Sequence, residues 1–580
     1  MDSRPGVHGA GPLQTILSSS LRKLLLYRAT KKADTLRGFR FSRCRLNARR
    51  SNARLPVARR CGEPHTERIY RGSQATFFLA ARRDAKHFPM RHWKPVVLLL
   101  LLIAASLLVE RLVVEAKKHR SPVLLPPRRN HAENRFNVLL IAMETTRRGH
   151  LSCYGYDRET TPNLDRLAAD GLRFTHAEAV SNWTLPTHAS MFSGLYPDSH
   201  GARFLSKDEL PDPSLEQYEG RMVPACRTMA ELLLEAGYRT GAVCGNPGYL
   251  DRRFQLDQGF EHYDARPGVP PNWYRPAEQI TDEAIRWLKY GMQVEPERPF
   301  FLFLNYMDPH HPYNPPPEYV RRFAKHNDDE LRPRREKYFR DLFVRVNQDG
   351  ETLTEKQSAL LVDRYDGEIA YTDHEIGRLI DWLRGWNLYH DTIIILTGDH
   401  GEALGEHGVR GHCFRLYEGE LAVPMIVKLP HSEARGVRDE GVQHVDVLPT
   451  VLDRLGLPCP GEVQGQSMLD LKPRDLLAAK HLDYRMLGFP PPLGQNQWAL
   501  YRGRMKYVQY ADYPPELFDL ENDPGEMVNL ARKRPDEVRT LHHALDQLRQ
   551  NIRPLGPFTP AVMPQNKKTA EKLRELGYAE

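Results

Sequence analysis

Residues 392–402 read Thr-Ile-Ile-Ile-Leu-Thr-Gly-Asp-His-Gly-Glu, so an unbroken apolar run passes directly into acidic and imidazole side chains. A short β-branched run of this kind predicts a strand buried on both faces, as in a parallel sheet. Asp399 and His400 would then lie at the carboxyl edge of the sheet, where open α/β folds place their ligands. A carboxylate beside an imidazole indicates a metal site, and the alternative is an exposed turn rich in glycine and acidic residues.

Two further apolar runs end in the same kinds of residue. Residues 135–143, Arg-Phe-Asn-Val-Leu-Leu-Ile-Ala-Met, precede Glu144, and residues 299–306, Pro-Phe-Phe-Leu-Phe-Leu-Asn-Tyr, precede Asp308 and His310. Three predicted strands therefore release polar side chains at one edge of a sheet. This agreement favours a shared site over an exposed turn.

Residues 182–190, Asn-Trp-Thr-Leu-Pro-Thr-His-Ala-Ser, precede Gly194. We expect Thr187 to cap a short helix that Gly194 closes, with the Thr184 hydroxyl near unpaired backbone donors and the positive end of the helix dipole. Such a place favours a tetrahedral anion. The alternative is that both threonines only cap and turn the chain.

The order of predicted elements indicates an α/β fold with a large, mostly parallel sheet between helix layers. Helices are predicted over residues 161–171, 229–237 and 365–386. Later in the chain, a predicted hairpin at 497–510 and a helix at 535–552 indicate a smaller C-terminal α+β subdomain. We expect a catalytic domain over 135–457, and a C-terminal antiparallel-sheet subdomain and tail over 458–580.

The charge of the chain is concentrated at its start. Residues 1–89 hold 20 Lys+Arg and 5 Asp+Glu, a net charge of +15, whereas the whole chain carries +8. We expect residues 1–89 to be a disordered leader or extension. The remaining chain carries 8 − 15 = −7, and we do not expect the folded body to bind nucleic acid.

An apolar segment follows the leader. Residues 96–109 are uninterrupted by charge, which predicts a signal anchor or transmembrane segment over 90–115, with a cleaved signal peptide as the competing interpretation. Residues 116–134 are proline-rich and charged, as in a linker. The catalytic body is expected on the extracytoplasmic side of a membrane, periplasmic or extracellular.

The chain resembles the type I sulfatases of the alkaline phosphatase superfamily. The resemblance extends in order over roughly residues 135–531 and is carried by these segments: 137–147, 150–156, 161–168, 183–190, 308–310, 365–373, 398–402, 416–418, 446–450 and 516–526. It implies an alkaline phosphatase-like or sulfatase-like fold and hydrolysis of an anionic ester.

Thr184 occupies the nucleophile position of that family. Sulfatases hold Cys or Ser there, which is oxidised to formylglycine, and a threonine would lose its methyl carbon in giving that aldehyde. Thr184 instead resembles the unmodified nucleophile of phosphodiesterases, phosphonate hydrolases and phosphoethanolamine transferases in the wider superfamily. This difference favours phosphate or phosphonate esters.

The resemblance implies one or two divalent metal ions held by Glu144, Asp399 and His400 together with Thr184. Calcium is the ion of the resembling family. Glu144 is followed by Thr145, where the family has one or two Asp, and His400 stands where sulfatases have Asn. Because imidazole replaces an amide oxygen, manganese or zinc is also expected.

Three histidines complete the expected site. His310 and His412 stand where the family keeps histidine or lysine to contact the anionic group and protonate the leaving oxygen, a role suited to a pKa near neutrality. His188 replaces the family's arginine and is expected to touch the substrate oxyanion. His311 and His407 are weaker candidates, since residues beside proline or glycine often only shape a loop.

The expected function is metal-dependent hydrolysis of a sulfate or phosphate ester through a covalent intermediate on Thr184. The substrate would be a sulfated or phosphorylated glycan, lipid or small molecule. Two alternatives stay open. One is a membrane-anchored transferase of a phosphoryl-linked head group, and the other is a degenerate member that binds anionic glycans without turnover.

Overall fold

The computed structural model describes residues 135–209, 217–268, 274–324, 342–481 and 492–561 of the 580-residue chain. These residues fall within one unit of the chain, Leu124–Glu580. The predicted leader 1–89, anchor 90–115 and linker 116–134 lie outside the described residues. Among the residues that are described, no helix has both the length and the apolar character needed to cross a membrane.

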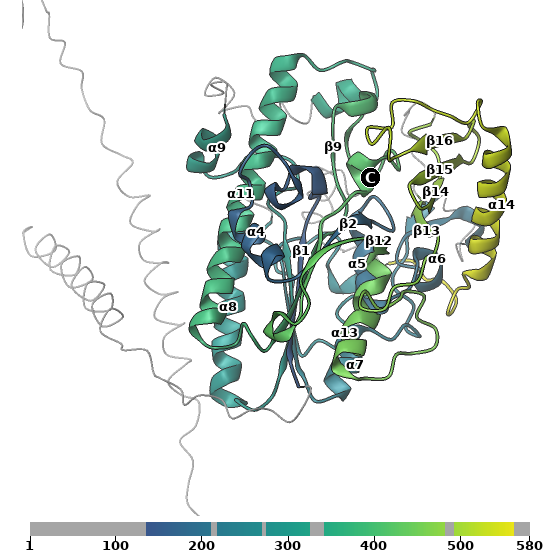
Figure 1. Cartoon of the computed structure of the whole chain (residues 1–580). Helices are drawn as coiled ribbons and strands as arrows, with labels where there is room; N and C mark the ends of the chain where they lie inside the picture. Colours follow the sequence, from purple (N-terminus) through teal and green to yellow (C-terminus); the bar gives the residue numbers. More distant parts are fainter. Residues whose placement is uncertain (1–134, 210–216, 269–273, 325–341, 482–491, 562–580) are drawn as a thin grey trace, which may run out of the picture. The chain divides into compact units, whose positions relative to one another are not determined.

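An eight-stranded sheet forms the centre of this unit, in the order β12-β2-β11-β8-β1-β7-β5-β6 (Figure 1). Its pairings are parallel except at β11, which runs antiparallel to both β2 and β8. This confirms the predicted large, mostly parallel sheet. The strands are β1 Asn137–Met143, β2 Leu172–Glu178, β5 Arg239–Cys244, β6 His262–Asp264, β7 Phe300–Tyr306, β8 Thr392–Gly398, β11 Met425–Lys428 and β12 Gly436–Gln443.

Helices cover both faces of the sheet. Because successive side chains of a strand point to opposite faces, β1 contributes Val138 and Leu140 to one core and Leu139 and Ile141 to the other. The first core contains residues of α5 Thr184–Ser193, α7 Met229–Glu235 and α13 Val447–Leu455. The second contains residues of α4 Pro162–Ala169, α8 Ala277–Val294 and α11 Glu355–Gly385 (Figure 1). The sheet is thus buried on both sides, as the apolar strands predict.

Helix α11 begins about ten residues before the start predicted from periodicity. Thr354 caps it, because the Thr354 side chain accepts from the Gln357 backbone N–H and the Gln357 side chain accepts from the Thr354 backbone N–H. This reciprocal capping box starts the helix in a polar segment where an apolar repeat gives little signal. The predicted helices at 161–171 and 229–237 correspond to α4 and α7.

The C-terminal subdomain is the predicted antiparallel sheet with a helix. Its strand order is β13-β14-β15-β16, and α14 packs on it through Leu541 and Leu545. The bounds are β13 Leu476–Lys480, β14 Gln497–Arg502, β15 Met505–Tyr510, β16 Glu516–Asp519 and α14 Pro535–Asn551. Smaller elements are β3 Phe204–Ser206, β4 Gln217–Glu219, β9 Ala403–Leu404, β10 Arg410–Gly411, α6 Pro197–His200, α9 Pro317–Phe323 and α12 Glu418–Leu421.

The register of the central strands positions the site. Met143 at the end of β1 pairs with Gly398 of β8 on one side and with Tyr306 of β7 on the other. The residues that follow these three strands therefore meet at one edge. Strand β5 lies next to β7 in the same direction, so a fourth strand end joins them.

Candidate active site

Asp399 and Glu144 lie side by side because they follow register partners on β8 and β1. Both side chains are buried. Asp399 Oδ1 accepts hydrogen bonds from the backbone N–H groups of Thr145, at 2.9 Å, and His400, at 2.8 Å, whereas Oδ2 has no hydrogen-bond partner among the described residues. Burial, with the adjacent Glu144 carboxylate, raises the pKa of Asp399 well above its usual range. Two buried carboxylates in contact call for a cation.

Thr145 adopts a backbone conformation that β-branched residues rarely take, with φ of +50°. Its N–H points at Asp399, and its hydroxyl donates to the Pro309 carbonyl at 3.0 Å. Holding a residue in this backbone conformation costs on the order of 1–3 kcal/mol, and the conformation persists only where the surrounding structure fixes it. The turn after β1 is therefore strained at the point where it meets Asp399.

Thr184 is the first residue of α5, and its hydroxyl donates to Glu144 Oε2 at 3.0 Å. The prediction that Thr187 caps this helix is wrong: α5 begins three residues earlier, and the Thr187 hydroxyl donates to the Thr184 carbonyl at 2.9 Å. Pro186 allows this early start, because proline is tolerated in the first turn of a helix. Gly194, with φ of +69°, closes the helix as predicted.

Two amides that the sequence interpretation missed hold the other oxygen of Glu144. Asn305 Nδ2 lies 2.7 Å and Asn246 Nδ2 lies 3.2 Å from Glu144 Oε1. Asn305 belongs to β7 and Asn246 follows β5, so both come from the same sheet edge. A single amide within an otherwise apolar strand is the signal that identifies Asn305 in retrospect.

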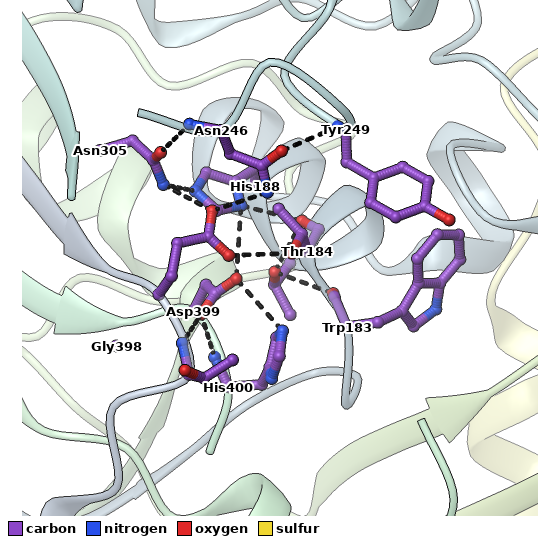
Figure 2. Close-up of polar contacts among 12 residues, drawn as sticks. Trp183, Thr184, His188, Asn246, Tyr249, Asn305, Gly398, Asp399 and His400 are labelled. Atoms are coloured by element: carbon purple, nitrogen blue, oxygen red, sulfur yellow. Dashed lines mark hydrogen bonds and ion pairs between the residues drawn. The ribbon is translucent and has the colours of Figure 1, made fainter. Parts of the chain in front are cut away.

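His188 lies one turn along α5 from Thr184 (Figure 2). Its Nδ1–H donates to the Thr184 carbonyl at 2.8 Å, so Nε2 holds the lone pair and accepts from Asn305 Nδ2 at 3.3 Å. Burial lowers the pKa of His188, which keeps the ring neutral. These contacts orient the start of the helix, and the expected contact with a substrate oxyanion stays a prediction.

His400 presents a lone pair to Asp399. Its Nδ1–H donates to the Gly401 carbonyl at 2.8 Å. Its Nε2 lies 3.3 Å from Asp399 Oδ2 and has no hydrogen-bond partner in the part of the chain that the structure describes (Figure 2). These two buried atoms, Asp399 Oδ2 and His400 Nε2, face each other in an arrangement that fits a bound cation. One ligand atom each of Glu144, His188 and Asp399 also lies within 4.8 Å of the others. Both His188 nitrogens are engaged, so the residues that could hold an ion here are Glu144, Asp399, His400 and Thr184.

His310 and His412 lie in a neighbouring cluster with His311 and Glu402. The His400 and His412 ring centroids are 4.6 Å apart, and those of His310 and His412 are 5.0 Å apart. Glu402, a further residue that the sequence interpretation did not identify, is fully buried. The structure thus brings Glu144, Thr184, His188, Asp399 and His400 together, with His310 and His412 in the cluster beside them.

The weaker candidate His407 lies elsewhere. Its ring is exposed, and its Nε2–H donates to the Gly525 carbonyl at 2.9 Å.

Comparison with known proteins agrees with this fold. The sequence matches the Sulfatase family over residues 136–457 and the C-terminal family of N-sulphoglucosamine sulphohydrolase over residues 405–551. An arylsulfatase of Clostridium perfringens is 25% identical over 467 residues, covering 68% of this chain and 90% of that protein. The multifunctional alkaline phosphatase superfamily protein PehA of Trinickia caryophylli is 29% identical over 481 residues, covering 68% and 91%.

A solved structure shares the fold. The phosphonate monoester hydrolase of Agrobacterium radiobacter superimposes with a TM-score of 0.56 at 22% identity, over 72% of this chain and 95% of that one. The chain belongs to the sulfatase family of the alkaline phosphatase superfamily. It is a sulfatase-like hydrolase.

Proposed function

We propose that this hydrolase uses the Thr184 hydroxyl as its nucleophile, with a divalent cation held by Glu144, Asp399 and His400, and prefers phosphate or phosphonate esters. The observation that carries the proposal is the Thr184 hydroxyl, at the positive end of α5 and 3.0 Å from Glu144 Oε2. The Glu144 carboxylate can accept the proton of this hydroxyl, and the dipole of α5 favours the anionic group that the hydroxyl attacks.

The chemistry follows from these contacts. Thr184 Oγ attacks the phosphorus atom, and the hydroxyl proton passes to Glu144 Oε2. The bond from phosphorus to the leaving oxygen breaks, and that oxygen takes up a proton donated by His310 or His412, which the incoming water later replaces. Water then attacks the phosphothreonine, releasing phosphate and restoring the Thr184 hydroxyl.

The donor set fits a divalent ion with oxygen and nitrogen ligands. When bound, the ion would lower the pKa of the Thr184 hydroxyl and offset negative charge on the transferred group. Because His400 supplies an imidazole whose lone pair faces Asp399, manganese or zinc is favoured over calcium.

The predicted proton donors to the leaving oxygen are His310 and His412. Burial, with the adjacent imidazoles, lowers the pKa of His310 well below its usual range, so this ring is neutral in the free protein. An anionic substrate beside it would favour the protonated form. The acid role of His310 therefore depends on substrate binding.

The proposed substrate is an anionic ester on a glycan, lipid or small molecule. We also propose that residues 90–115 anchor the chain with its catalytic body on the extracytoplasmic side, supported by the uncharged run at 96–109. The transferase and the non-catalytic binder find no support in the relatives described above.

The test is turnover by the full chain, stripped of metal and assayed with aryl phosphate, aryl sulfate and a phosphonate monoester in the presence of calcium, manganese or zinc. Thr184→Val should reduce turnover by roughly 10⁴-fold or more, whereas the matched control Thr187→Val should retain it. Acid quenching should trap a phosphoryl group on Thr184. Full activity of Thr184→Val would refute the proposal.

The same assay separates the alternatives. Diversion of product by an added alcohol acceptor would indicate a transferase. Binding of anionic glycan that is equal in the wild type and Thr184→Val, without turnover by either, would indicate a non-catalytic member.

A further inference from the structure

The Glu420 side chain is a buried carboxylate that accepts three hydrogen bonds. It belongs to α12. Its Oε2 accepts from Asn182 Nδ2 at 2.8 Å and from the Phe414 backbone N–H at 3.2 Å. Its Oε1 accepts from the Arg415 backbone N–H at 3.0 Å. All three partners are donors, so this position suits a carboxylate, which accepts on both oxygens.

These hydrogen bonds join the two segments that carry Thr184 and His412. Asn182 lies two residues before Thr184, and Cys413 directly follows His412. Asn182 also binds the second segment directly. Its backbone carbonyl accepts from the Cys413 N–H at 3.2 Å, and its Nδ2 donates to the Arg415 carbonyl at 3.3 Å. The position of the His412 segment relative to the nucleophile segment therefore depends on this network of hydrogen bonds.

The backbone of Cys413 is strained. Its φ is +73°, in a region that residues other than glycine rarely adopt. Such a conformation costs on the order of 1–3 kcal/mol and persists only where the surrounding structure fixes it. The hydrogen bond of Cys413 to Asn182, with those of the next two residues to Glu420, supplies this restraint. Because Cys413 directly follows His412, its relaxation would move the His412 ring.

The His412 ring lies beside the other predicted site residues. It is buried, with its centroid 4.6 Å from that of His400 and 5.0 Å from that of His310. A group that donates a proton to a leaving oxygen must lie within about 2.6–3.2 Å of it. A displacement of about 1 Å can therefore cost about 100-fold in rate. A change in the residues that hold the His412 segment would alter catalysis without touching the substrate.

The C-terminal subdomain also holds this segment. Gln497 of β14 donates from Nε2 to the Phe414 carbonyl at 2.7 Å, and its Oε1 accepts from the Leu416 backbone N–H at 3.2 Å. These bonds do not involve Glu420 or Asn182. Loss of the Glu420 contacts should therefore shift the segment and not unfold it.

We infer, on the basis of the proposed function, that Glu420 and Asn182 are positioning residues that hold His412 as the proton donor to the leaving oxygen. Both act through residues 412–415 and not by contact with the ester. The alternative is that the same hydrogen bonds only stabilise the fold.

The experiment compares kcat/KM of the full chain for two aryl phosphates, since kcat/KM includes the step in which the leaving oxygen departs. Dinitrophenyl phosphate has a weakly basic leaving oxygen that departs without a proton, whereas the strongly basic leaving oxygen of phenyl phosphate needs one. Glu420→Gln places an amide donor against N–H donors. Its kcat/KM should fall about 100-fold for phenyl phosphate and stay within about threefold for dinitrophenyl phosphate. Asn182→Ala should show the same selectivity and serves if Glu420→Gln does not fold.

Asp373→Asn is the matched control. Asp373 is also a buried carboxylate that accepts from one asparagine amide and two backbone N–H groups, those of Asn163 and Leu164. It joins α11 to α4 and not the two segments of the site. Asp373→Asn should lose stability in urea unfolding, as Glu420→Gln does, but keep kcat/KM for both esters within about twofold.

His412→Ala should reproduce the selective loss on phenyl phosphate. Absence of that loss in His412→Ala, or its presence in Asp373→Asn, would overturn the inference. Wild-type values in both Glu420→Gln and Asn182→Ala, or equal losses on the two esters, would also overturn it and leave the proposed function standing. Full activity of Thr184→Val would instead refute the proposed function itself, and the inference with it.

Discussion

Asp399→Asn should stabilise the metal-free protein and destabilise the metal-loaded protein relative to the wild type. The substituted side chain keeps an oxygen for the N–H groups of Thr145 and His400, which Asp399 Oδ1 now accepts. Its amide would replace Oδ2, which lies 3.3 Å from the unprotonated His400 Nε2. The amide N–H of the substituted side chain would then donate to His400 Nε2. The change also removes one of two adjacent buried carboxylates.

The magnitude follows from these contacts. Satisfying an unpaired buried acceptor is worth about 1–3 kcal/mol. For a unit of roughly 400 residues, an unfolding entropy of about 2.1 cal/mol/K per residue converts each kcal/mol to about 1 °C in Tm. The metal-free variant should therefore melt about 1–3 °C above the wild type. At a cation concentration about 1,000-fold above Kd, the wild type gains about 4.1 kcal/mol that the variant lacks, which reverses the order.

The difference should also depend on pH. Burial and Glu144 raise the folded-state pKa of Asp399. A group with a raised folded-state pKa contributes stability that is full below its unfolded value, about 3.9, and is lost as pH rises through the folded value. The metal-free wild type should therefore lose stability relative to Asp399→Asn as pH rises above about 4.

The assay is differential scanning fluorimetry with chelator and with saturating Mn²⁺ or Zn²⁺. Asp446→Asn is the matched control, because Asp446 is also a buried carboxylate but forms an ion pair with Arg474. Breaking this ion pair should lower Tm both with chelator and with cation. A metal-free Asp399→Asn that melts below the wild type, or an equal Tm gain from cation in both proteins, would refute the reasoning.

Three further changes test the surroundings of the site. Thr145→Asp adds a carboxylate beside Asp399, and Asp tolerates a positive φ better than Thr. The variant should therefore bind the cation at least about tenfold more tightly by calorimetry, and the metal-free protein should be less stable at neutral pH. Unchanged affinity would count against a cation there. Asn305→Ala should lower the free energy of unfolding in urea by about 1–3 kcal/mol and reduce kcat, because it removes the amide that lies 2.7 Å from Glu144 Oε1. A wild-type kcat would show that this amide does not position the site. His407→Ala should leave kcat/KM within about twofold, because surface changes away from a site have small effects; a large loss would place this exposed ring in catalysis.

The sheet and the strand ends could be predicted from sequence because their signals are local. The apolar runs at 137–143, 300–306 and 392–398 stand out from their neighbours, and a parallel sheet brings their carboxyl ends together. Glu144 and Asp399 were therefore predictable as neighbours. Comparison with relatives confirms the family, while the roles of the individual site residues stay predictions.

The supporting residues could not be predicted in the same way. Asn305 lies inside an apolar strand, and Glu402 follows a glycine-rich turn, so neither has a local pattern that reveals its partner. The predicted start of α5 is wrong because Thr184 and Thr187, on either side of Pro186, are both acceptable at the start of a helix. Which threonine begins the helix depends on Glu144, a contact that spans 40 residues of sequence.

The central place of β1 has a consequence during synthesis. The bond from the Thr145 N–H to Asp399 joins residues separated by 254 positions. A nascent chain on the ribosome thus presents β1 long before β8 is made, with one edge of the strand unpaired and open to wrong association. Because closing so long a loop is slow and the donors that we propose for the cation come from both ends of it, cation capture at that site would be a late event, after translation has passed residue 400.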